Sequence, residues 1–159
     1  MFTLRATRKL LALMVAKPES APSPPTTVLG DWYANVTTRG LILCVSEKTL
    51  LPVVLPGERL RALARELPRA LGAVLDSLGV DKTAIERERF AMAQSAVSTT
   101  ASRRIVGFLN EFGVMMEAGR DDHRSPLEVA LDLAHTPCNA SSSKLVTWPD
   151  HATRAAFGV

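Results

Sequence analysis

The sequence is poor in cysteine, in aromatic residues and in long apolar runs. Only two cysteines occur, Cys44 and Cys138, so no disulfide framework can be argued and we expect a cytoplasmic protein. Aromatic residues make up 5% of the chain, which indicates an aliphatic core. No apolar run approaches the roughly 20 residues that a membrane-spanning helix needs, so we expect no contact with a membrane.

The motifs of common enzyme and cofactor sites are also missing. The sequence has no P-loop, no G-x-G-x-x-G, no G-x-S-x-G and no H-E-x-x-H. His135 and Cys138 form an H-x-x-C pair, but a structural zinc site needs four ligands, so we expect neither metal nor cofactor. Cys138 with a histidine also suits a nucleophilic pair, although Pro137 and a helix end fit a structural role at least as well.

Charge of one sign is not concentrated anywhere. The chain has 19 Lys and Arg against 16 Asp and Glu, a net charge of +3, which permits an anionic partner but lacks the basic stripe of a dedicated nucleic-acid binder. The nearest clusters are Arg5, Arg8 and Lys9, and the pair Arg103-Arg104, and a solvated helix face is the favoured interpretation of both. No small-residue cleavage site follows the first cluster, so we do not expect a signal peptide.

The patterning predicts an α+β fold, with a small mixed sheet of about four to five strands packed with four to five helices. We expect a single domain over residues 1–159, with an exposed proline-rich loop at 17–27. Strand patterns cover residues 2–6, 31–38, 41–45, 50–55 and 90–99. Helix patterns cover residues 8–15, 58–78, 82–89, 102–118, 126–135 and 149–157, and polar turns are expected at 121–123 and 139–144.

Glycine and proline refine these predictions. Gly40 marks the turn of a hairpin between the second and third strands. A proline inside 50–55 restricts that strand to an edge or a bulge. Pro68 is expected to kink the helix at 58–78 or to divide it, and Gly79 to end it.

The helix predicted from residue 102 contains two glycines within S-R-R-I-V-G-F-L-N-E-F-G. Gly107 falls opposite the core stripe, one turn from Arg103 and from Asn110. Because an interior glycine costs about 1 kcal/mol relative to alanine, something is expected to lie close to its backbone. Packing of a second element is the favoured interpretation, and a ligand held by Arg103 and Asn110 is the alternative. The predicted core stripe is Ile105, Phe108, Leu109, Phe112, Met115 and Met116.

Five segments together resemble an uncharacterised bacterial family, a domain of unknown function. They are TRKLL near the start, LGDWYAN at 29–35, VSEKTLLPVVLP at 45–56, SRRIVGFLNEF at 102–112 and LAHTPC at 133–138. The family's late motif looks like Asn-Arg-Ser, an apolar pair, Gly and Asn-Asp. Arg103 or Arg104, Gly107, Asn110 and Glu111 stand at the matching places, with Glu111 in place of the usual aspartate. The resemblance implies a shared fold and no established activity.

The segment G-D-W-Y-A-N offers a second group of candidate residues. Asp31, Trp32 and Asn35 combine an acceptor, an aromatic ring and an amide that suit a stacked base or a polar ligand. A packing cluster at the start of a strand is the favoured interpretation, because Trp32 and Tyr33 face opposite ways in a strand. The candidate ligand-binding residues are therefore Arg103, Arg104, Gly107, Asn110, Glu111, Asp31, Trp32 and Asn35.

Two functions fit these observations. The favoured one is a small intracellular binding or regulatory module that contacts nucleic acid or a protein partner, as in a toxin–antitoxin pair. The alternative is an enzyme acting on a nucleotide or phosphorylated substrate, in which Arg103 binds the anion, Asn110 orients the substrate, and Glu111 or Asp31 is the acid or base. Neither the partner nor the oligomeric state follows from the sequence.

Overall fold

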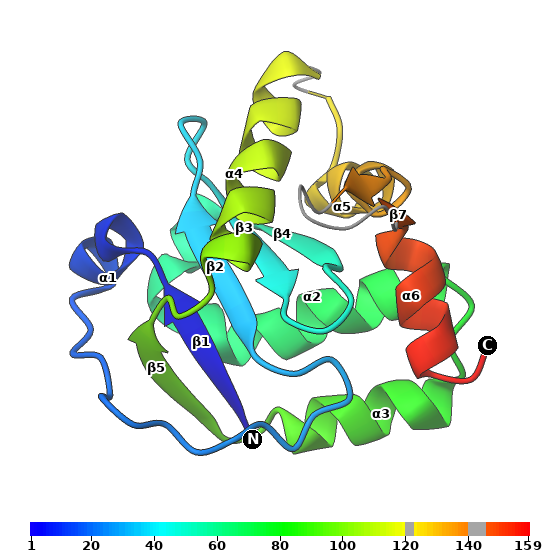
Figure 1. Ribbon diagram of the computed structural model, residues 1–159, viewed down its shortest axis with the longest axis horizontal. Helices are drawn as coiled ribbons and strands as arrows, with labels where there is room; N and C mark the ends of the chain where they lie inside the picture. The colour runs from blue at the N-terminus through cyan, green and yellow to red at the C-terminus, as the bar shows by residue number, and fades with distance from the viewer. Residues whose placement is uncertain (120–122, 140–145) are drawn as a thin grey trace.

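A computed structural model describes residues 1–119, 123–139 and 146–159. The main elements of the described chain are a five-stranded mixed sheet and six α-helices, which confirms the α+β prediction (Figure 1). The sheet contains β1 (Phe2–Ala6), β2 (Trp32–Val36), β3 (Leu41–Ser46), β4 (Pro52–Pro56) and β5 (Ser95–Thr99). The helices are α1 (Arg8–Met14), α2 (Leu63–Ser77), α3 (Lys82–Ala91), α4 (Arg103–Ala118), α5 (Pro126–Ala134) and α6 (Pro149–Ala156). A 3-10 helix (Gly57–Ala62) precedes α2, and β6 (Cys138–Asn139) pairs with β7 (Val146–Thr147).

The strand order is β4-β3-β2-β1-β5. β1 pairs in parallel with β2 and β5, whereas β2, β3 and β4 pair antiparallel, and Gly40 turns the predicted hairpin with a φ of 73°. β4 is an edge strand, as its prolines require, because Pro52 and Pro56 have no N–H to donate to a ladder.

Alternate residues of β2 point to opposite sides of the sheet. The Tyr33 hydroxyl accepts a hydrogen bond from the backbone N–H of Ser102, 3.1 Å away, so Tyr33 and Asn35 point toward α4. Trp32 points to the other side and is completely buried. Figure 1 shows α4 in front of the sheet and α2 behind it, so each face of the strands is covered by a helix.

Several elements differ from their sequence predictions. α2 continues through Pro68 without dividing there, and the change from 3-10 to α-helix occurs earlier, at Leu63. β5 begins only at Ser95, because α3, capped by the Asp81 carboxylate, extends to Ala91. The pair β6–β7 was not predicted, since two-residue strands carry no periodicity. The predicted turns at 121–123 and 139–144 lie mostly outside the described residues.

The proline-rich segment 17–27 contains no helix or strand, and backbone hydrogen bonds fasten it. Glu19 N–H donates to the Val97 carbonyl at 2.8 Å, and Thr26 N–H donates to the Met1 carbonyl at 2.9 Å. Within the described part of the chain, no helix is both long enough and apolar enough to cross a bilayer.

Candidate functional site

Gly107 lies on the open side of α4. A Cβ built there has no other described part of the chain within 4 Å, so the favoured interpretation, close packing of a second element, is wrong. The predicted core side of the helix is correct for Ile105, Phe108, Leu109, Phe112 and Met116, which are buried, whereas Met115 is 38% exposed.

A groove lies farther along the same helix, where α4 passes over β2 and β3. It has a volume of about 330 Å³ and is bounded on one side by Lys9 of α1. Asn35 and Asn110, two of the predicted site residues, both line it. Gly113 lies one turn after Asn110, and a Cβ there would meet no other described part of the chain, so backbone is exposed in this wall.

The first amide of the groove is held in place by the start of α1. The Asn35 side-chain oxygen accepts hydrogen bonds from the Thr7 hydroxyl at 2.7 Å and from the Val36 N–H at 2.9 Å. The Thr7 hydroxyl in turn accepts from Leu10 N–H at 3.3 Å and caps α1. Because the oxygen of Asn35 is engaged, its NH₂ group is the part that can donate to a ligand.

The remaining walls of the groove have different chemistry. Asn110 is exposed and forms no hydrogen bond with another described residue, and Lys9 forms no ion pair there. The Thr38 hydroxyl contacts the Glu117 carboxylate and joins the hairpin to the end of α4. Apolar side chains between these groups are those of Val36, Leu43, Leu109 and Val114.

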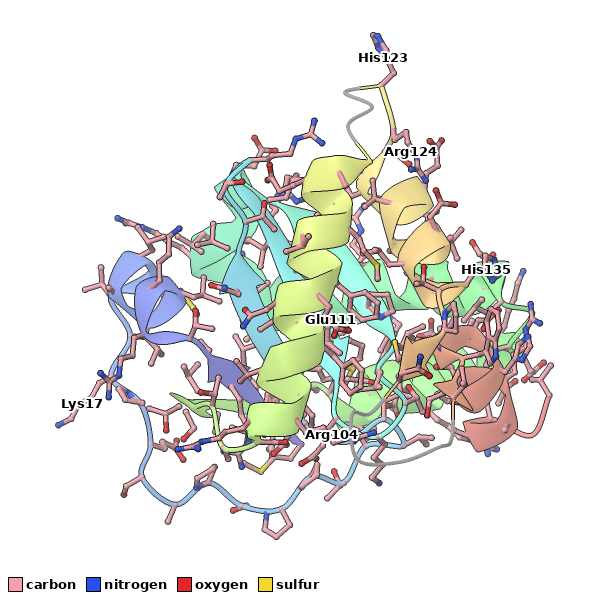
Figure 2. The ribbon with its side chains drawn as sticks, turned by 45° about the horizontal axis from the view of Figure 1, so that its top comes forward. Lys17, Arg104, Glu111, His123, Arg124 and His135 are labelled. Carbon is pink, nitrogen blue, oxygen red and sulfur yellow. The ribbon has the colours of Figure 1, made fainter. Side chains whose placement is uncertain are left out.

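Arg104 and Glu111 lie on another flank of α4 and do not join the groove. The Arg104 guanidinium lies 5.3 Å from the centre of the Phe108 ring, and Figure 2 shows Glu111 farther along the same helix. Both charges act on Cys138: burial and, to a smaller extent, Glu111 raise the pKa of its thiol, Arg104 opposes the rise, and the net value is about 11. Cys138 is therefore a protonated thiol at neutral pH, which does not suit a nucleophile.

His135, the histidine of the H-x-x-C pair, has Asp150 as its partner and not Cys138. His135 Nδ1 lies 2.6 Å from the Asp150 carboxylate, which is buried at the start of α6. Cys138 instead directs its thiol toward the Thr136 carbonyl, at 3.7 Å. In the described ranges, no three His, Cys, Asp or Glu side chains are grouped to hold a metal ion.

Asp31 and Trp32 are interior residues. The Asp31 carboxylate accepts from Thr3 N–H at 2.8 Å and pairs with Arg5 Nε at 3.1 Å, while Trp32 has no exposed surface. These contacts agree with the favoured packing interpretation of this segment. Arg103 is exposed at the start of α4, on the same face as Gly107.

A family model described as Domain of unknown function (DUF6933) matches residues 3–152. The chain belongs to this family. No curated protein and no solved structure matches it. The match confirms the resemblance to an uncharacterised family and assigns no activity to the chain.

The DUF6933 fold thus separates the predicted residues into four places. It brings Asn35 and Asn110 together in the groove, leaves Arg104 and Glu111 on another flank of α4, and buries Asp31 with Trp32. Arg103 and Gly107 lie on the exposed face of the same helix. Sequence reasoning missed Lys9, which was assigned to a solvated face, and Gly113, although an interior glycine was a visible signal.

Proposed function

We propose that this chain is a binding module that holds a segment of a protein partner in the groove between α1, β2 and α4. One observation carries the proposal: the groove combines an apolar floor with polar groups that other described residues leave available. These groups are the Asn110 amide, the NH₂ of Asn35 and the Lys9 ammonium.

The chemistry of these groups suits a polypeptide. A carboxamide both donates and accepts hydrogen bonds, so Asn110 can pair with a peptide's N–H and C=O groups. Gly113 supports this fit, because a wall without a side chain lets a second backbone come close. Val114, which lines the groove, is 69% exposed, and apolar surface continues beside the groove at Leu13, which follows Lys9 by one turn of α1 and is 47% exposed.

A nucleic-acid partner has less support. Trp32 and Tyr33 are buried, so neither can stack on a base at this groove. Only one basic residue, Lys9, is among the described residues that line the groove, and the acidic Glu117 lines it as well. A phosphate backbone needs several cations in a row.

The enzymatic alternative also has less support. Asn110 lines the groove, whereas Glu111 acts on Cys138 from another flank, and Asp31 is bonded to Arg5. The predicted acid or base therefore does not face the residue predicted to orient the substrate. A regulatory role, in a toxin–antitoxin pair or otherwise, would follow from the identity of the partner and remains a prediction.

Selection from a random peptide library displayed on phage, with the folded chain as bait, tests the proposal. We expect a selected peptide to bind about five- to thirtyfold more weakly to Asn110→Ala, because the loss of a hydrogen bond to a buried peptide group costs about 1–2 kcal/mol. Gly113→Leu should block binding because its side chain would occupy the groove beside the exposed backbone. Isothermal titration calorimetry measures both effects.

Glu111→Ala is the matched control, because it changes the neighbouring residue on another flank of the same helix. It should bind the peptide as well as the unchanged chain does, and the melting temperatures of Asn110→Ala and Glu111→Ala should agree. The proposal would be refuted if selected peptides bound Asn110→Ala and Gly113→Leu with the same affinity as the unchanged chain. So would a failure to select any peptide together with salt-dependent retention on heparin, which would favour nucleic acid.

A further inference from the structure

A second hollow lies at the β4 edge of the sheet, away from the α4 groove. It has a volume of about 490 Å³, within the range of small-molecule sites, and lies between β4, α2 and α5. α2 contributes a stripe of residues three or four apart, and α5 contributes its first turns. The two helices approach each other here, but short side chains keep them from filling the space between them: Ala70, Ala73 and Ala130.

The interior of this hollow is apolar. Its walls are the side chains of Val53, Leu55, Val74 and Leu127, which offer no hydrogen bonds. A polar ligand body placed there would lose its hydrogen bonds to water without replacement. The occupant must therefore have an apolar body.

The rim is charged and predominantly basic. Arg59 and Arg69 line the hollow together with one acid, Glu66. Over the described ranges, neither guanidinium has an ion pair or a hydrogen bond, and Glu66 has none either. Arg69 follows Glu66 by one turn of α2, yet the two do not pair, so Arg69 is available to an external anion.

We infer that this hollow is a binding site for a small amphipathic anion, an alkyl or aryl carboxylate whose apolar body lies against β4, α2 and α5. The carboxylate is held by Arg59 and Arg69, whose planar guanidinium groups match carboxylate geometry. The negative charge of Glu66 repels the ligand carboxylate and lowers the affinity. The site is separate from the groove proposed for a protein partner, so either proposal can fail without the other.

Calorimetric titration of the whole chain with decanoate tests the inference, with decan-1-ol as the uncharged comparison. We expect one decanoate per chain and binding at least about tenfold tighter than that of decan-1-ol, because the alcohol cannot form charge-assisted hydrogen bonds with both guanidinium groups. Arg69→Gln and Arg59→Gln should each weaken decanoate binding by a similar factor. Glu66→Gln should strengthen it.

Two further variants separate a built site from adhesion to apolar surface. Ala70→Leu should fill the hollow, abolish decanoate binding and leave the melting temperature unchanged or higher. Arg65→Gln, on the same helix but outside the lining of the hollow, should leave binding unchanged. The inference is overturned if decanoate fails to bind, if decan-1-ol binds equally well, or if Ala70→Leu still binds decanoate.

Discussion

Gly57 is the residue at which this chain needs a glycine for close packing. A Cβ there would lie 1.9 Å from the carbonyl oxygen of Gly40 in the β2–β3 turn, closer than any two such atoms can approach. Gly107 and Gly113 meet no such neighbour among the described residues, and both lie in a regular helix. The folding of the isolated chain therefore explains Gly57 and gives no reason for the other two.

This contrast predicts opposite effects of alanine at two glycines. Gly57→Ala should lower the free energy of unfolding by about 3 kcal/mol, because the added methyl group must displace backbone. Gly107→Ala should raise it by up to about 1 kcal/mol, because alanine favours the helix and the site has room. Urea unfolding of both variants measures the effects, and a destabilising Gly107→Ala would mean that another part of the chain packs against this position.

At the scale of elements, a side chain of α3 binds the backbone just after the proline-rich segment 17–27. The Glu88 carboxylate is buried and accepts hydrogen bonds from Val28 N–H at 2.8 Å and from Leu29 N–H at 3.1 Å. These donors lie just before β2, so one side chain of α3 fixes where the chain enters the sheet. A buried carboxylate without these donors would be costly.

We therefore predict that Glu88→Gln lowers the free energy of unfolding by about 2 kcal/mol. Its amide can accept from one N–H but turns an NH₂ group toward the other, which leaves a buried donor unpaired. Glu86→Gln is the control on the same helix, since its ion pair with Arg89 is exposed and should change stability by less than about 0.5 kcal/mol. Equal unfolding midpoints for the two variants would contradict this role of Glu88.

α4 shows how one helix serves three surroundings. One side packs on the sheet, a second borders the groove through Asn110 and Gly113, and a third places Arg104 and Glu111 near Cys138. Asn110 and Glu111 are adjacent in sequence but about 100° apart around the helix. They consequently belong to different surfaces, which is why a single site containing both did not form.

The whole molecule should lose stability at alkaline pH because both of its thiols are buried. Burial raises the pKa of Cys138 from 9.0 to about 11, and burial raises the pKa of Cys44 in the same direction. Between pH 9 and pH 11 the unfolded chain releases the Cys138 proton while the folded chain keeps it, so the free energy of unfolding falls as the pH rises. The contribution of Cys138 is complete below pH 9 and is lost above about pH 11.

Urea unfolding between pH 8 and pH 10.5 measures this loss. Two pKa units correspond to roughly 3 kcal/mol at most, so the curve for the unchanged chain should fall more steeply than that for Cys138→Ala. Taking the difference between the two curves removes the titration of lysine and tyrosine, which they share. Parallel curves would mean that the Cys138 thiol ionises as readily in the folded chain as in the unfolded one.

The sequence by itself determined most of the elements and the inward side of α4. Ile105, Phe108 and Phe112 repeat with the helical period, and Gly40 marks a turn, which are local signals within a few residues. Pro52 likewise indicated an edge strand before any pairing was known, because a missing N–H is a property of the residue alone.

Only the tertiary structure decided which outward residues meet. Lys9, Asn35 and Asn110 come from three segments, and they line one groove because β1, which leads into α1, lies beside β2, and α4 crosses over β2 and β3. The same holds for Gly57, whose neighbour Gly40 lies on another turn. Periodicity reports the side of an element that faces the core, since burial depends on local hydrophobicity, but contacts between segments depend on how the chain packs in three dimensions.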